Sequence, residues 1–194
     1  GSPLIFREMM DITLLNCKAY IFENCPNTFQ SLVQNLSDFR FVLLNKDNSK
    51  AGISEHIEED HPANRLGLIY CDPSNADIPE SSIVEICHKY KKLDLLINLA
   101  CASWKRQINL PGYEPLNVVL KRLKKHWWIR STSEKKGIKH FQWCMFFGSN
   151  TKKHAFNSAT EEREWHSMDS PKGKELLNFY SLTSEELKKA KEKQ

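Results

Sequence analysis

Short apolar runs alternate with segments of helical periodicity over residues 1–100. Runs rich in Ile, Leu, Val and aromatic residues predict buried strands, which we expect at residues 19–23, 41–44, 66–71 and 93–99. Apolar positions at helical spacing predict helices, which we expect at residues 3–16, 24–39, 53–59 and 79–91. Strands that alternate with helices favour a parallel sheet with right-handed crossovers.

The pattern changes in the second half of the chain. Residues 111–126 read as a basic helical segment after a Pro-Gly pair, and residues 127–130 and 140–148 as two strands of an antiparallel hairpin. Residues 157–194 are charged and of helical composition. We therefore expect an α/β domain over residues 1–156 and a charged helical extension over residues 157–194.

A parallel sheet that ends in an antiparallel hairpin is the plan of the S-adenosylmethionine-dependent methyltransferase fold. The predicted fold class is therefore α/β, with a Rossmann-like, mostly parallel sheet and a terminal antiparallel hairpin. In that fold the first strand is central, whereas this chain begins at the helix that follows it. Unpaired backbone groups inside a sheet are costly, so we expect the central first strand upstream of residue 1 or on another chain.

The composition, with 40% hydrophobic and 27% charged residues, is that of an ordinary globular domain. It excludes a wholly disordered chain, a collagen-like chain and a disulfide-dense miniprotein. The sequence has neither an apolar run of about 18 residues nor a signal-peptide pattern, so we expect a cytoplasmic protein without a membrane partner. The six cysteines form no CxxC pair, which indicates reduced thiols and no metal site.

The net charge of +4 hides an uneven distribution, because residues 91–153 carry 14 Lys and Arg against 3 Asp and Glu. A basic segment between acidic flanks indicates a polyanionic partner, for which nucleic acid is the first candidate; the alternative is a solvated basic face. Trp104 would stack on a base or close the core, and the cations would contact phosphate or complement a helix dipole. The candidate nucleic-acid contacts are Trp104, Lys105, Arg106, Lys121, Arg122, Lys124 and Lys125.

Polar residues follow the first two predicted strands, where doubly wound sheets bind their ligands. Glu23, followed by Asn24, is placed to accept hydrogen bonds from both hydroxyls of a ribose. The alternative is an acid at a helix start, with Asn24 or Asn27 as the cap. Asp47 or Asn48 would bind an adenine amino group, although both residue types are also common in loops.

The third predicted strand runs into Asp72, Pro73, Ser74 and Asn75. Amino methyltransferases carry a D/N-P-P-Y/F loop at this position, which holds the target amine through side-chain and carbonyl acceptors while an aromatic ring stacks on the flipped base. Here Ser74 and Asn75 replace the Pro-aromatic half. These four residues are the candidate catalytic loop, and the alternative is a turn without a ligand.

The segment from Asp72 to Arg106 resembles the three-Cys-motif partner family, TcmP. That family reads Asp-Pro-Phe-Gly, then a polar helix, then D-L-L-I-N-F and a downstream arginine; the matching stretches here are DPSN at 72–75, DLLINL at 94–99 and Arg106. The opening GSPLI resembles the family's G-S-P-L segment, and QWCMFFGSN resembles its hairpin strand Y-Y-L-F-F-A-T-N. The resemblance spans residues 1–150 in order.

This resemblance implies a class I methyltransferase that uses S-adenosylmethionine and is encoded beside a protein with three clustered cysteines, apparently of radical-SAM type. It implies that Glu23 binds the ribose, Asp47 or Asn48 the adenine, and Asp72 the methionine side or the substrate amine. The leading hypothesis is therefore a methyltransferase acting on an amino group of a nucleic-acid base.

The alternative is a catalytically inactive nucleic-acid-binding module of a modification or defence complex. A third reading, a nuclease or hydrolase, would bring Asp47, Asp72 and Asp94 together around Mg²⁺. It is disfavoured because Asp94 begins its predicted strand, at the opposite end from Asp72.

Overall fold

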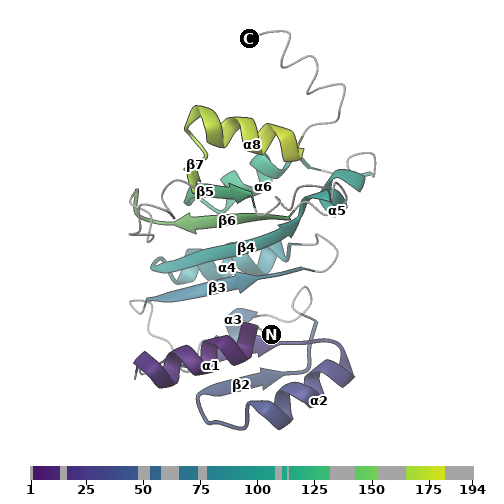
Figure 1. Ribbon diagram of the computed structural model, residues 1–194, viewed down its shortest axis with the longest axis vertical. Helices are drawn as coiled ribbons and strands as arrows, with labels where there is room; N and C mark the ends of the chain where they lie inside the picture. The colour runs from purple at the N-terminus through teal and green to yellow at the C-terminus, as the bar shows by residue number, and fades with distance from the viewer. Residues whose placement is uncertain are drawn as a thin grey trace. The chain divides into compact units, whose positions relative to one another are not determined.

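The chain folds as two compact units, Gly1–His61 and Pro62–Gln194, each with a sheet and a core of its own. The computed structural model describes residues 2–13, 17–47, 53–57, 66–73, 78–107, 111–112, 114–131, 143–152 and 165–181. Figure 1 shows the elements of both units. The α/β class expected from the sequence is confirmed.

The first unit is built around a two-stranded parallel sheet, and its core is small. The strands are β1 (Ala19–Phe22) and β2 (Phe41–Leu44), and the helices are α1 (Ser2–Thr13), α2 (Pro26–Asn35) and α3 (Ile53–Ile57). Met10 of α1, Leu36 after α2 and Phe41 of β2 are buried together. The side chains of β1 are half-buried, so the expectation of a buried strand at 19–23 is wrong in this respect.

The second unit has a five-stranded sheet in the order β3-β4-β6-β5-β7. Its strands are β3 (Gly67–Cys71), β4 (Leu93–Ala100), β5 (His126–Ser131), β6 (Trp143–Ser149) and β7 (His166–Ser167). Its helices are α4 (Glu80–Lys89), α5 (Cys101–Arg106), α6 (Leu116–Arg122) and α8 (Pro171–Ser181). The β5–β6 pair is the antiparallel hairpin that the sequence predicts.

The expectation of a mostly parallel sheet is wrong for this second unit. Only β3 and β4 pair in parallel among its described strands, whereas the β4–β6, β6–β5 and β5–β7 pairs are antiparallel. The antiparallel pairs with β4 and β5 arise because β6, the second strand of the hairpin, lies between these two strands and runs in the opposite direction (Figure 1). Strands β1 and β2 form a separate sheet in the described part of the chain and do not extend this one.

The core of the second unit lies on alternate positions of β4 and the hairpin strands. Leu95, Ile97 and Leu99 are buried on β4, as the period of two in a half-covered strand requires. Trp127 is 8% exposed, and its ring contacts β6 where Gly148 leaves room: a Cβ there would lie 2.7 Å from the ring carbons. The indole Nε1 of Trp127 donates a hydrogen bond of 3.0 Å to the carbonyl oxygen of Leu120, which ties α6 to the hairpin.

Part of the segment expected to be a separate extension belongs to the second unit. Strand β7 pairs with β5, Leu177 of α8 is buried in the main core, and Trp165 packs against Trp128 and Phe147. The described residues 165–181 therefore pack within the second unit, whereas the sequence predicts a boundary between residues 156 and 157. The compact division falls between His61 and Pro62.

Candidate functional site

Asp72 directly follows β3, and its carboxylate is held by two neighbouring side chains. The register pairs Cys71 with Ile97, so Asp72 and Asn98 lie next to each other at the carboxyl end of the parallel pair. Asn98 Nδ2 donates to Asp72 Oδ1 over 3.1 Å, and the Tyr70 hydroxyl donates to Oδ2 over 3.1 Å. Each oxygen of an ionised carboxylate has a further acceptor position. The exposed Asp72 can therefore accept a hydrogen bond from a ligand as well.

The thiol next to this carboxylate is unsuited to nucleophilic chemistry. Cys71 is buried, and burial, helped by the charge of Asp72, raises the pKa of its thiol to about 12. Because the thiolate is the reactive form, Cys71 is inert at neutral pH. Pro73 is half-buried beside Asp72, whereas Ser74 and Asn75 lie outside the described residues.

Glu23 follows β1 in the first unit, at the carboxyl end of the β1–β2 pair. Its Oε1 accepts a hydrogen bond of 2.8 Å from the backbone N–H of Cys25, the residue before α2. Glu23 is thus an acid at a helix start, as the alternative reading proposes. The cap position is held by Cys25, so the expectation of Asn24 or Asn27 as the cap is wrong.

A contact between Lys46, which follows β2, and His56 of α3 was not predicted from the sequence. Lys46 Nζ lies 3.0 Å from His56 Nε2, and the His56 ring centroid lies 6.0 Å from that of Phe22. An ammonium group only donates hydrogen bonds, so this contact requires Nε2 of His56 to be the unprotonated acceptor. Two sequence features could have indicated this contact: the polar residues after β2 and the short helix predicted at residues 53–59.

The remaining candidate cofactor residues of the first unit are only partly described. Asn24 is exposed, and Asp47 is half-buried beside Lys46 in the chain. Asn48 lies outside the described residues. The described part of this strand end therefore contains the carboxylates of Glu23 and Asp47 and the cation of Lys46, which together offer both acceptors and donors to a polar ligand.

Trp104 and Arg122, two candidate nucleic-acid contacts, are held by contacts within the protein. Trp104 is 7% exposed and belongs to the core, so its ring is not available to stack on a base. Arg122 forms ion pairs with Glu80 and Glu114, and its Nη1 donates to Glu114 Oε1 over 2.9 Å. These hydrogen bonds raise the pKa of the Arg122 guanidinium and lower that of the Glu114 carboxyl. A phosphate would have to displace both carboxylates from Arg122.

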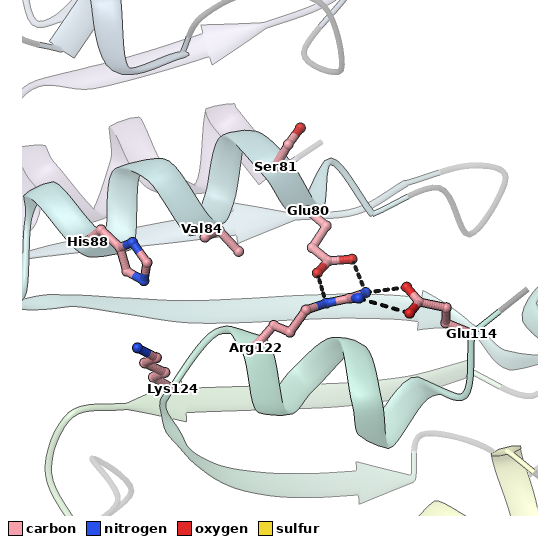
Figure 2. A pocket seen from close by; sticks show the side chains of 7 residues that line it. All are labelled: Glu80, Ser81, Val84, His88, Glu114, Arg122 and Lys124. Atoms are coloured by element: carbon pink, nitrogen blue, oxygen red, sulfur yellow. Dashed lines mark hydrogen bonds and ion pairs between the residues drawn. The ribbon is translucent and has the colours of Figure 1, made fainter. Parts of the chain in front are cut away.

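Arg122 also lines a shallow groove between α4 and α6 (Figure 2). Val84 and Ser81 contribute to the groove from α4. Figure 2 shows the ion pairs of Arg122 toward one end, where Glu80 and Glu114 lie, and His88 and Lys124 at the other end. The two ends of the groove therefore differ in charge.

The other cationic candidates are spread over two ends of the sheet. Arg106 is exposed at the end of α5 and donates to Ser103 Oγ over 3.3 Å, while the side chain of Lys105 is outside the described part. Lys121 and Lys124 are exposed near the end of α6. Lys125 is half-buried, and it donates to the carbonyl oxygen of Leu93 over 2.7 Å and to Asn150 Oδ1 over 2.9 Å.

Metal binding and membrane insertion gain no support from the described residues. Within the ranges that the structure describes, three or more His, Cys, Asp or Glu side chains nowhere gather in a way that would hold a metal ion. In the same ranges, none of the helices is both long enough and apolar enough to cross a bilayer.

These elements define a mixed α/β protein with polar residues at the carboxyl ends of its parallel strands. No family model and no curated protein matches the sequence. The chain is similar to a solved structure, that of protein LPL1258 from Legionella pneumophila strain Philadelphia 1, of the family DUF519, with a TM-score of 0.50 and 16% sequence identity. The likeness covers 84% of this chain and 56% of that protein, so the chain spans little more than half of its length. At this identity the likeness concerns the fold alone.

Proposed function

We propose that this chain belongs to an S-adenosylmethionine-dependent methyltransferase that acts on an amino group of a nucleic-acid base. The observation that carries the proposal is the Asp72 carboxylate, which Tyr70 and Asn98 hold at the carboxyl end of a parallel strand pair. A fixed, exposed acceptor at this position suits the orientation of an amine. The inert thiol of Cys71 argues against a cysteine nucleophile at the same strand end.

The strand arrangement supports the same proposal. Strand β6 runs antiparallel between β4 and β5, as expected for a sheet with parallel strands and a reversed hairpin strand. A reversed strand between two strands of one direction is a feature of the methyltransferase plan considered for the sequence, whereas the antiparallel pair with β7 at the edge is not part of that plan. The fold by itself does not define the reaction, so the argument rests on the side chains.

Asp72 would act by positioning rather than by covalent chemistry. It would accept a hydrogen bond from an N–H of the acceptor amine and so direct the nitrogen lone pair away from the carboxylate. The backbone carbonyl of the following residue, Pro73, would accept the second N–H. When bound, S-adenosylmethionine supplies an electrophilic methyl group for in-line transfer. The proton that the amine then loses would pass to Asp72 or to water.

Within the first unit taken by itself, Glu23 has the acceptor positions that the ribose of such a cofactor would need. The Cys25 amide uses one acceptor position of Glu23 Oε1, and a carboxylate has further positions on both oxygens. Two hydroxyl donors can therefore bind side by side while the contact at the start of α2 is kept. Lys46 and His56 lie at the same end of the β1–β2 pair, where they would limit the room for the adenine.

Glu23→Gln is expected to weaken the binding of S-adenosylhomocysteine by about 10- to 100-fold, the loss of one or two hydrogen bonds to a charged group. Glutamine keeps one carbonyl oxygen for the Cys25 amide, so the start of α2 should be preserved. Calorimetric titration of the full chain measures the change. Glu8→Gln, an exposed change on α1, is the matched control. If both variants bind S-adenosylhomocysteine as tightly as the wild type, Glu23 does not contribute to cofactor binding.

A catalytically inactive nucleic-acid-binding module is the second candidate. The observation that favours it is the set of exposed lysines that follow α4 and α6, away from Asp72. This candidate requires salt-dependent binding of nucleic acid and no affinity for S-adenosylhomocysteine. The same titration therefore separates the two candidates.

A further inference from the structure

Three turns of the second unit meet at the amino end of its sheet, opposite Asp72. Residues 88–92 lead into β4, residues 124–126 lead into β5, and residues 150–152 follow the antiparallel β6. Lys125 joins the three turns, because its Nζ donates both to the carbonyl oxygen of Leu93 and to Asn150 Oδ1. We call these three turns the amino-end surface.

The amino-end surface is strongly basic. Its sequence is HKYKK at 88–92, KKH at 124–126 and NTK at 150–152, without Asp or Glu. All of its lysines except Lys125 are exposed, namely Lys89, Lys91, Lys92, Lys124 and Lys152. The acids near this surface include the half-buried Asp94, which acts on Lys125, the exposed Glu85 one helical turn before Lys89, and the exposed Asp169 after β7. The positive charge of the surface therefore exceeds the negative charge around it.

The surface is held in a defined shape. Burial lowers the pKa of Lys125, and its two hydrogen bonds compensate for the lost hydration. Lys124 has a φ of 50°, a left-handed conformation that normally favours glycine after a helix. Its side chain lies at the same end of the groove as His88 (Figure 2). Lysines from separate segments are thus brought together by the fold rather than by one charged stretch.

We propose that the amino-end surface binds the phosphate backbone of a nucleic-acid duplex. Several separate ammonium groups on a rigid surface match a regular row of phosphates, which a protein contacts mainly through such cations. Single strands are usually bound on exposed aromatic rings. Among the described residues of this surface, Tyr90 is 3% exposed, and the adjoining Trp127 is also buried. The large aromatic rings of these turns are therefore not available for stacking, which favours a duplex, and the exposed rings are the imidazoles of His88 and His126.

This inference deepens the proposed function, because it rests on a nucleic-acid substrate, but it does not depend on the cofactor. The surface and Asp72 lie at opposite ends of the same sheet. The lysines would therefore hold a stretch of duplex remote from the base that is modified. They would contribute to affinity and not to the choice of base.

The test replaces exposed lysines from all three turns by alanine: Lys91, Lys92, Lys124 and Lys152. Fluorescence anisotropy with a labelled DNA duplex of about 20 base pairs measures binding, and an RNA duplex and a single strand of the same sequence are run beside it. Binding by the variant is expected to be at least about tenfold weaker, and the slope of log affinity against log salt smaller by about 3. Since these side chains are exposed, the unfolding temperature should be unchanged.

The control variant loses the same amount of charge elsewhere in the chain, through alanine at Arg7, Lys18, Lys172 and Lys174. It should keep most of the affinity and the salt slope. Equal losses in the two variants would overturn the proposal, because binding would then follow net charge. Absence of duplex binding by the wild type, or stronger binding of the single strand, would also overturn it. Unchanged calorimetric binding of S-adenosylhomocysteine by the lysine variant keeps this result separate from the cofactor question.

Discussion

Asp72→Ala is expected to slow methyl transfer by at least about 100-fold, the effect of losing a group that orients the reacting atoms. Alanine removes both oxygens that would accept from the amine, while Tyr70 and Asn98 keep their places on β3 and β4. Steady-state rates over a range of nucleic-acid concentrations measure the loss. The decrease should appear in kcat, with little change in KM, because Asp72 lies far from the amino-end surface.

The control for this experiment is Asp169→Ala. Asp169 is an exposed aspartate of the same unit, between β7 and α8, and lies at the other end of the sheet. This variant should transfer methyl groups at the wild-type rate. Transfer at the wild-type rate by Asp72→Ala as well would exclude Asp72 from the reaction.

Trp127→Ala is expected to lower the free energy of unfolding of the second unit by about 3–5 kcal/mol, the usual cost of truncating a large buried aromatic side chain. The change opens a cavity beside Gly148 and leaves the carbonyl oxygen of Leu120 without its indole donor. Urea unfolding followed by circular dichroism measures the loss. Trp127→Phe is the graded comparison, because it mainly removes the hydrogen bond and should cost about 1–3 kcal/mol.

If Trp127→Ala lowers the free energy of unfolding by less than about 1 kcal/mol, the change is as small as that of a surface substitution. Such a result would contradict the burial of Trp127 in the hairpin. Nucleic-acid binding by a folded Trp127→Phe variant should equal that of the wild type. Both expectations follow from the 8% exposure of Trp127, which makes it a core residue rather than a platform for bases.

The positions of most strands and helices follow from local periodicity. The expected strand at 93–99 is observed as Leu93–Ala100, and the expected helix at 79–91 as Glu80–Lys89. In these elements the alternation of buried and exposed residues is present within a few consecutive positions, and hydrophobic periodicity detects such a pattern. The two-residue strand β7 is too short to show any alternation, so its pairing with β5 could not be anticipated.

Sheet pairing depends on contacts between distant parts of the chain, and here the sequence is less informative. Alternation of strands and helices favours parallel neighbours, but the hairpin turns β6 back between β4 and β5. The separation of β1 and β2 into a sheet of their own likewise has no local signal. The prediction of a mostly parallel sheet was wrong because it depends on these long-range pairings.

The candidate site shows the same limit. Asp72 and Glu23 could be selected because each follows an apolar strand, and the structure finds both at a carboxyl strand end. The ion pair between Arg122 and Glu80 could not be recognised in the sequence, because these two residues are 42 positions apart. The role of Lys125 as a tether between turns depends on Leu93 and Asn150, which are equally remote.

Incubation of the full chain with methyl-labelled S-adenosylmethionine and duplex nucleic acid tests the central claim most directly. Digestion to nucleosides and mass spectrometry then identify any methylated product. The account predicts a labelled nucleoside with the methyl group on an exocyclic amine, formed by the wild type and not by Asp72→Ala. Binding of S-adenosylhomocysteine and of duplex without any labelled nucleoside, or a methyl group on a ring carbon or a ribose oxygen, would contradict it.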